Sequence, residues 1–245
     1  MPRLDAICFD LDATLVDYDS AAMGRIVEGV CAAIAPDLPA VDASVLEEHH
    51  STISPEEWRA WSAGLGDPGG VSDRSGAGIM RRSWRKALAA CGCEDETLAE
   101  RAFDLYWRQT RSLFKPFDDA APLLQLLHGK YRLAVVTNGP ADTQLDKLTT
   151  AGLDGYFDVF VASGGAGVAK PDARIFRYAL DKLGVEPERS LHIGDWLADD
   201  VAGALNAGLT AVWLNRRGRQ REASDPVPHH EIASLGELRG LLDSG

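Results

Sequence analysis

Carboxylates crowd the end of the first apolar segment of the chain, which reads ICFDLDATLVDYD over residues 7–19. Asp10 and Asp12 stand there two residues apart, so a strand continuing through both would aim their side chains to the same face. Carboxylates repel one another and lose hydration on leaving water, so packing alone does not favour this arrangement. Mg²⁺ would offset the repulsion, because one or two carboxylates can hold it together with waters and substrate oxygens. The pair therefore indicates a metal site.

Further polar groups follow later apolar segments. Thr137-Asn138-Gly139 ends one of them and Asp195 ends another. A hydroxyl, a main-chain N–H and the charge of Lys170 are suitable for holding phosphoryl oxygens. An aspartate can attack phosphorus to form an aspartyl-phosphate, while a second carboxyl moves protons. Taken singly, each group also fits a turn or a solvated surface position; together, they indicate phosphoryl chemistry.

The elements that must position these groups differ along the chain. Residues 18–115 repeat apolar residues at helical spacing, whereas apolar runs and helical segments alternate from residue 120 onward. Alternation of this kind predicts a Rossmann-like α/β fold, a parallel sheet flanked by helices, over residues 1–17 and 116–245. Residues 18–115 are then an inserted all-helical domain. Ligands of such sheets bind at the carboxyl ends of the strands, where the polar groups should converge.

Local patterns predict further details of both parts. The α/β part should contain five strands, which are LDAICF, YRLAVVTN, FDVFVAS, SLHIGD and TAVWLN. In the insertion, Ser54 followed by Pro55 has the composition of a helix start. The pairs His49-His50 and His229-His230 are expected to be exposed, and His192 to be a buried residue with its hydrogen bonds satisfied.

The composition excludes several classes of protein. A net charge of -12 argues against general nucleic-acid binding, which depends mainly on lysine and arginine. The four cysteines have no spacing that suggests a disulfide framework. No apolar run approaches a membrane span, and no charged-then-apolar leader precedes Asp10, so the expectation is a cytoplasmic protein without membrane partners.

Four segments resemble, in order and spacing, the motifs of the haloacid dehalogenase superfamily of hydrolases; they are DLDATLVD, VVTNG, AKPDARIF and HIGDWLADDVAGALNAG. The helical insertion resembles the cap domain of that superfamily's first type. The resemblance covers the whole chain. It is specific for the superfamily and says little about the substrate.

Carried over position by position, the resemblance implies a set of carboxylate roles. Asp10 would be the nucleophile, and Asp12 the general acid and base with its carbonyl on Mg²⁺. Asp195 would bind the metal directly. Asp200 matches the last acidic position of the fourth motif, as a direct ligand or as support for one, whereas Asp199 is expected to be a favourable charge in the first turn of a helix.

The resemblance also implies a phosphate cradle and contains one departure. Thr137 and Asn138 would hold the phosphoryl group, and Lys170 would neutralise charge around it. Ala13 stands where the family usually has glycine. Dehalogenases of the superfamily lack a carboxylate at the position of Asp12, so its presence here favours phosphate ester hydrolysis.

The expected function is that of a Mg²⁺-dependent phosphatase acting on a small phosphorylated metabolite. Phosphoglycolate, a sugar phosphate and a nucleoside monophosphate all fit the motifs. The alternatives are a phosphomutase of the same superfamily, which would return the phosphoryl group to a second hydroxyl, and a non-catalytic binding protein on the same fold. Closure of the cap is expected to exclude water and to read the part of the substrate beyond its phosphate.

Overall fold

The computed structural model describes residues 4–17, 19–38, 41–65 and 75–243. The chain divides into two compact units, one comprising Met1–Asp17 with Lys115–Gly245 and the other Tyr18–Phe114. The division expected from the sequence differs from this one only in the assignment of residue 115. Within the described ranges, no helix combines the length and apolar character needed to cross a bilayer.

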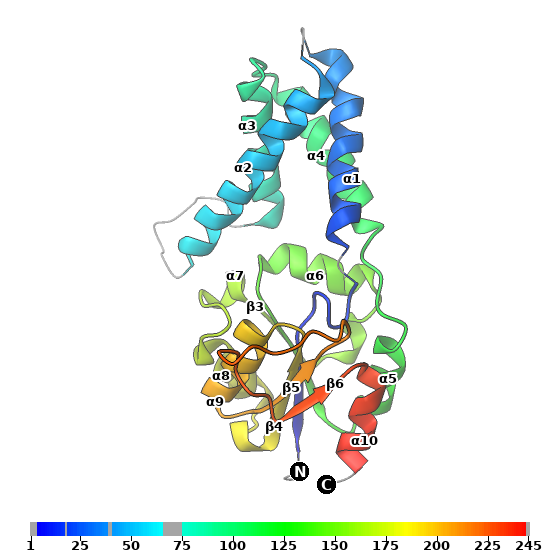
Figure 1. Cartoon of the computed structure of the whole chain (residues 1–245), viewed down its shortest axis with the longest axis vertical. Helices are drawn as coiled ribbons and strands as arrows, with labels where there is room; N and C mark the ends of the chain where they lie inside the picture. Colours follow the sequence, from blue (N-terminus) through cyan, green and yellow to red (C-terminus); the bar gives the residue numbers. More distant parts are fainter. Residues whose placement is uncertain (1–3, 18, 39–40, 66–74, 244–245) are drawn as a thin grey trace. The chain divides into compact units, whose positions relative to one another are not determined.

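The first unit is built on a parallel six-stranded sheet with the order β3-β2-β1-β4-β5-β6 (Figure 1). The strands are β1 (Ala6–Phe9), β2 (Arg132–Thr137), β3 (Val159–Ala162), β4 (Ser190–Gly194), β5 (Thr210–Leu214) and β6 (His230–Ile232). The predicted α/β class is confirmed, and five of these strands fall in the expected segments. The sixth strand escaped prediction because it has only three residues and no continuous apolar run.

Helices cover both faces of this sheet, as the apolar strands require. The helices of the unit are α5 (Ala120–Leu127), α6 (Ala141–Thr150), α7 (Ser163–Ala166), α8 (Ala173–Leu183), α9 (Ala202–Ala207) and α10 (Leu238–Asp243). Phe176 of α8 packs in one buried cluster with Cys8 and Trp213 of the sheet. A Cβ atom at Gly203 of α9 would lie 2.6 Å from the Phe176 ring, so this glycine allows α8 and α9 to approach closely. Figure 1 shows α5 and α10 on the other side of the sheet.

The strand order decides which loops meet. The central strand β1 pairs with β2 and β4, and Phe9 lies opposite both Val135 and Ile193. The main chain continues this alignment past the strand, since Asp10 N donates to Ile193 O at 2.8 Å. The polar groups that follow β1, β2 and β4 therefore lie at one edge, as the sequence predicted.

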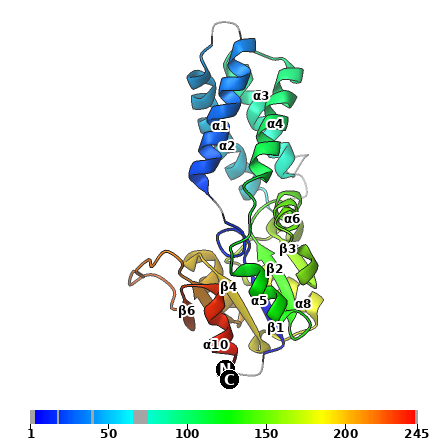
Figure 2. The same cartoon turned by 90° about the vertical axis from the view of Figure 1, so that its right-hand side faces the viewer.

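The second unit is all helical within its described residues. Its helices are α1 (Ser20–Ile34), α2 (Ala43–Ala63), α3 (Gly76–Ala90) and α4 (Glu96–Arg111), and Figure 2 shows them side by side. They share one apolar core in which Trp84 is fully buried. The predicted helix start at Ser54 is wrong: α2 begins at Ala43 after Asp42 and runs through Pro55. Apolar residues at helical spacing upstream of Pro55 bury the inner face of one continuous helix, and this burial outweighs the local preference of Ser54-Pro55 for a helix start.

His50 is buried, so its predicted exposure is wrong. Continuation of α2 places it four residues after Leu46 on the inner face, and only 3 % of its surface is exposed. Its ring stacks on Trp84 with 4.0 Å between the centroids. Burial lowers the pKa of His50 to about 4. His49 and His230 also depart from prediction, because both are half-buried, whereas His229 is exposed as expected.

The stability of the helical unit should depend on the protonation of His50. Above its ordinary pKa of 6.5 the ring is neutral in both states, whereas below that pH the unfolded chain binds a proton that the folded chain takes up only near pH 4. The free energy of unfolding should therefore fall as the pH decreases, by about 2 kcal/mol between pH 6.5 and 5. His50→Phe, which keeps the stack on Trp84, should remove this part of the pH dependence.

Urea unfolding of the wild type and of His50→Phe at pH 7.5 and 5 measures this effect. The difference between the two proteins in how the free energy of unfolding changes with pH isolates the contribution of His50, because the other titratable groups are common to both. His49→Phe, one residue earlier on the same helix, serves as the control and should retain the wild-type dependence. Equal pH dependence in His50→Phe and the wild type would contradict the assignment to His50.

Candidate active site

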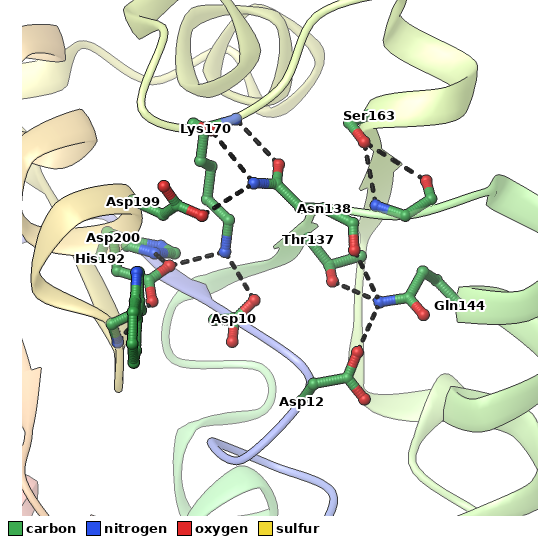
Figure 3. Close-up of polar contacts among 12 residues, drawn as sticks. Asp10, Asp12, Thr137, Asn138, Gln144, Ser163, Lys170, His192, Asp199 and Asp200 are labelled. Carbon is green, nitrogen blue, oxygen red and sulfur yellow. Dashed lines mark hydrogen bonds and ion pairs between the residues drawn. The ribbon is translucent and has the colours of Figure 1, made fainter. Parts of the chain in front are cut away.

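Three strand ends and one loop bring the predicted site residues together (Figure 3). Asp10 follows β1, Thr137 ends β2 and Asp195 follows β4. Lys170 reaches them from the loop between α7 and α8. Asp10, Thr137 and Lys170 are all buried, with 6 %, 1 % and 6 % of their surfaces exposed. Burying so many polar groups together is costly unless they pair with one another or bind a ligand, and such a concentration indicates a functional site.

Lys170 joins the nucleophile candidate to the fourth motif. Its Nζ donates to Asp10 Oδ1 at 2.6 Å and to Asp200 Oδ1 at 2.6 Å. Burial alone would lower the pKa of Lys170, but the charges of the two carboxylates outweigh that effect and raise it. The lysine is therefore a fixed positive charge beside Asp10.

Asp200 lies on a short π-helical turn, Leu197–Val201, that precedes α9. Besides Lys170, His192 Nε2 donates to its Oδ1 at 3.0 Å and Trp196 N donates to its Oδ2 at 2.9 Å. Burial would raise the pKa of Asp200, but the lysine charge and the His192 hydrogen bond hold it well below its usual range. His192 is buried in β4 as expected, and its Nε2 binds a site residue. Its buried Nδ1 has no hydrogen-bond partner among the described residues, so the expectation that all its hydrogen bonds are satisfied was wrong.

Three carboxylates gather around one point. Asp10, Asp195 and Asp200 each offer an oxygen, and these oxygens lie within 4.8 Å of one another. Burial raises the pKa of Asp10 to about 8, with further increases from the charges of Asp200 and Asp12 and opposition from Lys170. Burial and the charge of Asp200 raise the pKa of Asp195 to about 6. When all three carboxylates are ionised, the single charge of Lys170 does not balance them, and an oxygen-binding divalent cation fits this donor set.

Asp12 points elsewhere. The strand ends at Phe9, before the strand alternation could place Asp10 and Asp12 on one face, so that expectation was wrong. The chain turns instead, with Ala13 at a φ of 59°, the left-handed region that glycine adopts most readily. The Asp12 carboxylate faces α6, where Lys147 Nζ lies 2.8 Å from each of its oxygens. The Asp12 carboxylate is therefore absent from the three-carboxylate group.

Comparison with known proteins supplies the family. A family model described as haloacid dehalogenase-like hydrolase matches residues 4–208. The chain belongs to this family. Over its full length it is 31 % identical to N-acylneuraminate-9-phosphatase of Mus musculus, covering 96 % of that protein. The match and such relatives place this hydrolase in the phosphatase branch of the superfamily.

Solved structures similar to this chain agree with the family. A 2-haloacid dehalogenase from Pseudomonas syringae pv. Tomato DC3000 is 29 % identical with a TM-score of 0.75, and the match covers 98 % of this chain and 99 % of the dehalogenase. The putative HAD-hydrolase YfnB from Bacillus subtilis, bound to magnesium, is 25 % identical with a TM-score of 0.66 and the same coverage.

Asn138 connects two motifs of the hydrolase through its side chain. Its Oδ1 accepts from Lys170 N at 2.8 Å, and its Nδ2 donates to Lys170 O at 3.1 Å and to Asp199 Oδ2 at 3.2 Å. The sequence suggested only a main-chain N–H for this residue. Asp199, expected to be a simple helix-end charge, is thus part of the network that holds the lysine loop.

Two residues that the sequence reasoning missed, Gln144 and Lys147, contact the site from α6. Gln144 Nε2 donates to Asp12 Oδ2 at 2.9 Å and to Thr137 Oγ1 at 2.6 Å. Both side chains are buried, although they are long and polar. The sequence did contain a signal for them: two polar residues stand three apart on the inner face of a helix that directly follows a strand end.

Glycines make room for two of these side chains. Gly139 has a φ of 143°, and a Cβ atom there would lie 2.9 Å from Gln144 Cδ. A Cβ atom at Gly194, the last residue of β4, would lie 2.1 Å from Asp200 Cγ. Neither position accepts a larger residue without displacing a site residue.

Proposed function

We propose that this hydrolase is a Mg²⁺-dependent phosphatase that releases phosphate from a small metabolite through an aspartyl-phosphate on Asp10. The observation that carries the proposal is the position of the Asp10 carboxylate, bound by Lys170 and grouped with Asp195 and Asp200. Within the described residues its Oδ2 makes no hydrogen bond, which leaves an oxygen for attack on phosphorus.

The first half of the reaction transfers the phosphoryl group. Asp10 attacks phosphorus, the bond between phosphorus and the ester oxygen breaks, and protonated Asp12 gives its proton to the departing oxygen. The Thr137 hydroxyl and the Asn138 N–H hold phosphoryl oxygens, while Lys170 balances their charge. In the second half, Asp12 takes a proton from the attacking water, the new bond to phosphorus forms, and inorganic phosphate leaves Asp10.

Mg²⁺ would be held by Asp10, Asp195 and the Asp12 carbonyl, with Asp200 as a further ligand or as support. When bound, it would neutralise charge on the phosphoryl oxygens and on the carboxylates. The raised pKa values of Asp10 and Asp195 support this assignment, because burial and the charge of Asp200 disfavour both ionised carboxylates and the single charge of Lys170 only partly opposes that effect. The magnesium of the similar YfnB structure supports it as well.

Asp12 distinguishes phosphatase from dehalogenase chemistry. Relatives named for each reaction have similar identity to this chain, at 31 % and 29 %, so identity alone does not choose between them. A departing alkoxide needs a proton, whereas a halide does not, and Asp12 can supply one. A mutase would need the same groups, so the distinguishing product is inorganic phosphate as opposed to an isomeric ester.

We also propose a substrate class, which depends on the helical unit. We assign the helical unit the role of a cap that reads the part of the substrate beyond its phosphate. The full-length similarity to N-acylneuraminate-9-phosphatase supports an acylated sugar phosphate as the first substrate to test. Phosphoglycolate, other sugar phosphates and nucleoside monophosphates complete the panel.

Metal removal and a substrate panel test the proposal together. With Mg²⁺ present, the wild type should release inorganic phosphate from at least one member of the panel, and excess EDTA should reduce the rate by about 100-fold or more. Adding Mg²⁺ back should restore activity. ³¹P NMR identifies the products. Absence of phosphate release from every member, or formation of an isomer instead, would overturn the proposed phosphatase function.

A further inference from the structure

The inner face of α6 presents two polar side chains to the site. Gln144 and Lys147 lie three residues apart, with 2 % and 8 % of their surfaces exposed. Burying a long lysine and a glutamine costs desolvation and side-chain entropy. Their hydrogen bonds with Asp12 and Thr137 offset this cost. Both of these partners have a role in the proposed reaction.

Lys147 holds the Asp12 carboxylate by both oxygens. The Nζ atom lies 2.8 Å from Oδ1 and 2.8 Å from Oδ2, so this charge-assisted contact restricts rotation of the carboxylate. Lys170 binds Asp10 separately. Each of the two aspartates with assigned chemistry therefore has its own lysine, and the two lysines come from different elements.

Gln144 connects Asp12 to the phosphate cradle. Its Nε2 faces three oxygen atoms, Asp12 Oδ2 at 2.9 Å, Thr137 Oγ1 at 2.6 Å and Asn138 O at 3.2 Å. An amide oxygen in this place would face acceptors, so the network requires the nitrogen here. Because Thr137 Oγ1 accepts from Gln144, its own proton is directed to another acceptor, and a phosphoryl oxygen is the one the reaction supplies.

We propose that Lys147 and Gln144 are positioning residues of this phosphatase reaction. Lys147 orients the carboxylate that moves protons, whereas Gln144 orients both that carboxylate and the Thr137 hydroxyl. The assignment rests on the proposed function. It predicts different kinetic effects for substitutions at these two positions, which lie one helical turn apart. Both substitutions should impair proton transfer, whereas only substitution of Gln144 should weaken phosphate binding.

Lys147→Met should impair proton transfer without weakening phosphate binding. On alkyl phosphates, whose leaving oxygen needs a proton, kcat should fall about 10- to 100-fold, with KM and the Ki of inorganic phosphate within about twofold of wild type. p-Nitrophenyl phosphate needs no such proton. It should therefore give a stoichiometric burst of p-nitrophenolate, followed by slow turnover as water attack becomes limiting.

Gln144→Met keeps the length of the side chain and removes its donor. The Thr137 hydroxyl then loses the partner that orients it, so KM and the Ki of inorganic phosphate should rise about 10-fold, together with a fall in kcat. Lys147→Arg should recover part of the activity on alkyl phosphates, because the guanidinium keeps the charge and can bind a carboxylate through two N–H groups. Lys182→Met, on the exposed face of α8, is the matched control and should behave like the wild type.

Stopped-flow and steady-state assays on aryl and alkyl phosphates test these positioning roles. Thermal unfolding midpoints show whether each variant is folded. Lys147→Gln replaces Lys147→Met if the latter does not fold. Loss of the p-nitrophenolate burst, that is, a first-turnover rate reduced equally on aryl and alkyl phosphates, would overturn the positioning role while the phosphatase proposal stands, and so would wild-type rates in Lys147→Met. No hydrolysis of any monoester by the wild type would overturn both.

Discussion

Asp10→Asn should abolish phosphate release, with a loss of at least about 10⁴-fold in kcat. The asparagine amide has nearly the volume of the carboxylate but is a poor nucleophile, so the proposed covalent intermediate cannot form. Lys170 keeps its contact with Asp200 at 2.6 Å, and the buried cation is therefore not left unpaired. The variant should fold and lose only its chemistry.

Rapid acid quench and intact-protein mass spectrometry measure the intermediate directly. The wild type should carry a hydroxylamine-sensitive phosphoryl adduct during turnover, and Asp10→Asn should carry none. Asp17→Asn, an exposed aspartate of the same opening segment, is the matched control and should remain active. Turnover by Asp10→Asn above about one per cent of wild type would contradict nucleophilic attack by this residue.

Gly194→Ala should disrupt the proposed metal site without replacing any of the proposed ligands. A Cβ atom there would lie 2.1 Å from Asp200 Cγ and 2.5 Å from Asp200 Cβ. The main chain cannot yield easily, because Asp200 N donates to Trp196 O at 2.8 Å within the π-helical turn. The carboxylate must rotate away and lose its contacts with Lys170 and His192. We expect about 100-fold weaker Mg²⁺ binding and about 10³-fold lower kcat/KM.

Calorimetric titration with Mg²⁺ and steady-state kinetics check this expectation. Gly155→Ala is the matched control, because no atom lies within 4 Å of a Cβ placed there and its φ is ordinary. It should bind Mg²⁺ and turn over like the wild type. Wild-type Mg²⁺ affinity in Gly194→Ala would show that Asp200 is not needed in its observed position.

The fold could be predicted where the signal is local. Apolar runs alternating with helical segments determine a parallel sheet, and five of the six strands lie in the expected segments. β6 and the true start of α2 could not be predicted, because three residues carry too little pattern and Pro55 imitates a helix start. The burial of His50 was missed for the same reason, because it depends on α2 starting before Pro55.

The site divides in a similar way. The sequence by itself determined that Asp10, Thr137 and Asp195 end parallel strands and therefore meet at one edge, and its resemblance to the family supplied Lys170 and Asp200. Only the tertiary structure decided the partners of Asp12. Gln144 and Lys147 lie 132 and 135 residues away from it along the chain.

The physical reason is that strand alternation and helix periodicity are properties of a few neighbouring residues. The choice of a side chain's partner depends instead on which elements the sheet order places side by side. Here β2 pairs with β1, so the helix that follows β2 reaches the turn that follows β1. The turn at Ala13 then directs the Asp12 carboxylate toward that helix and away from the three-carboxylate group.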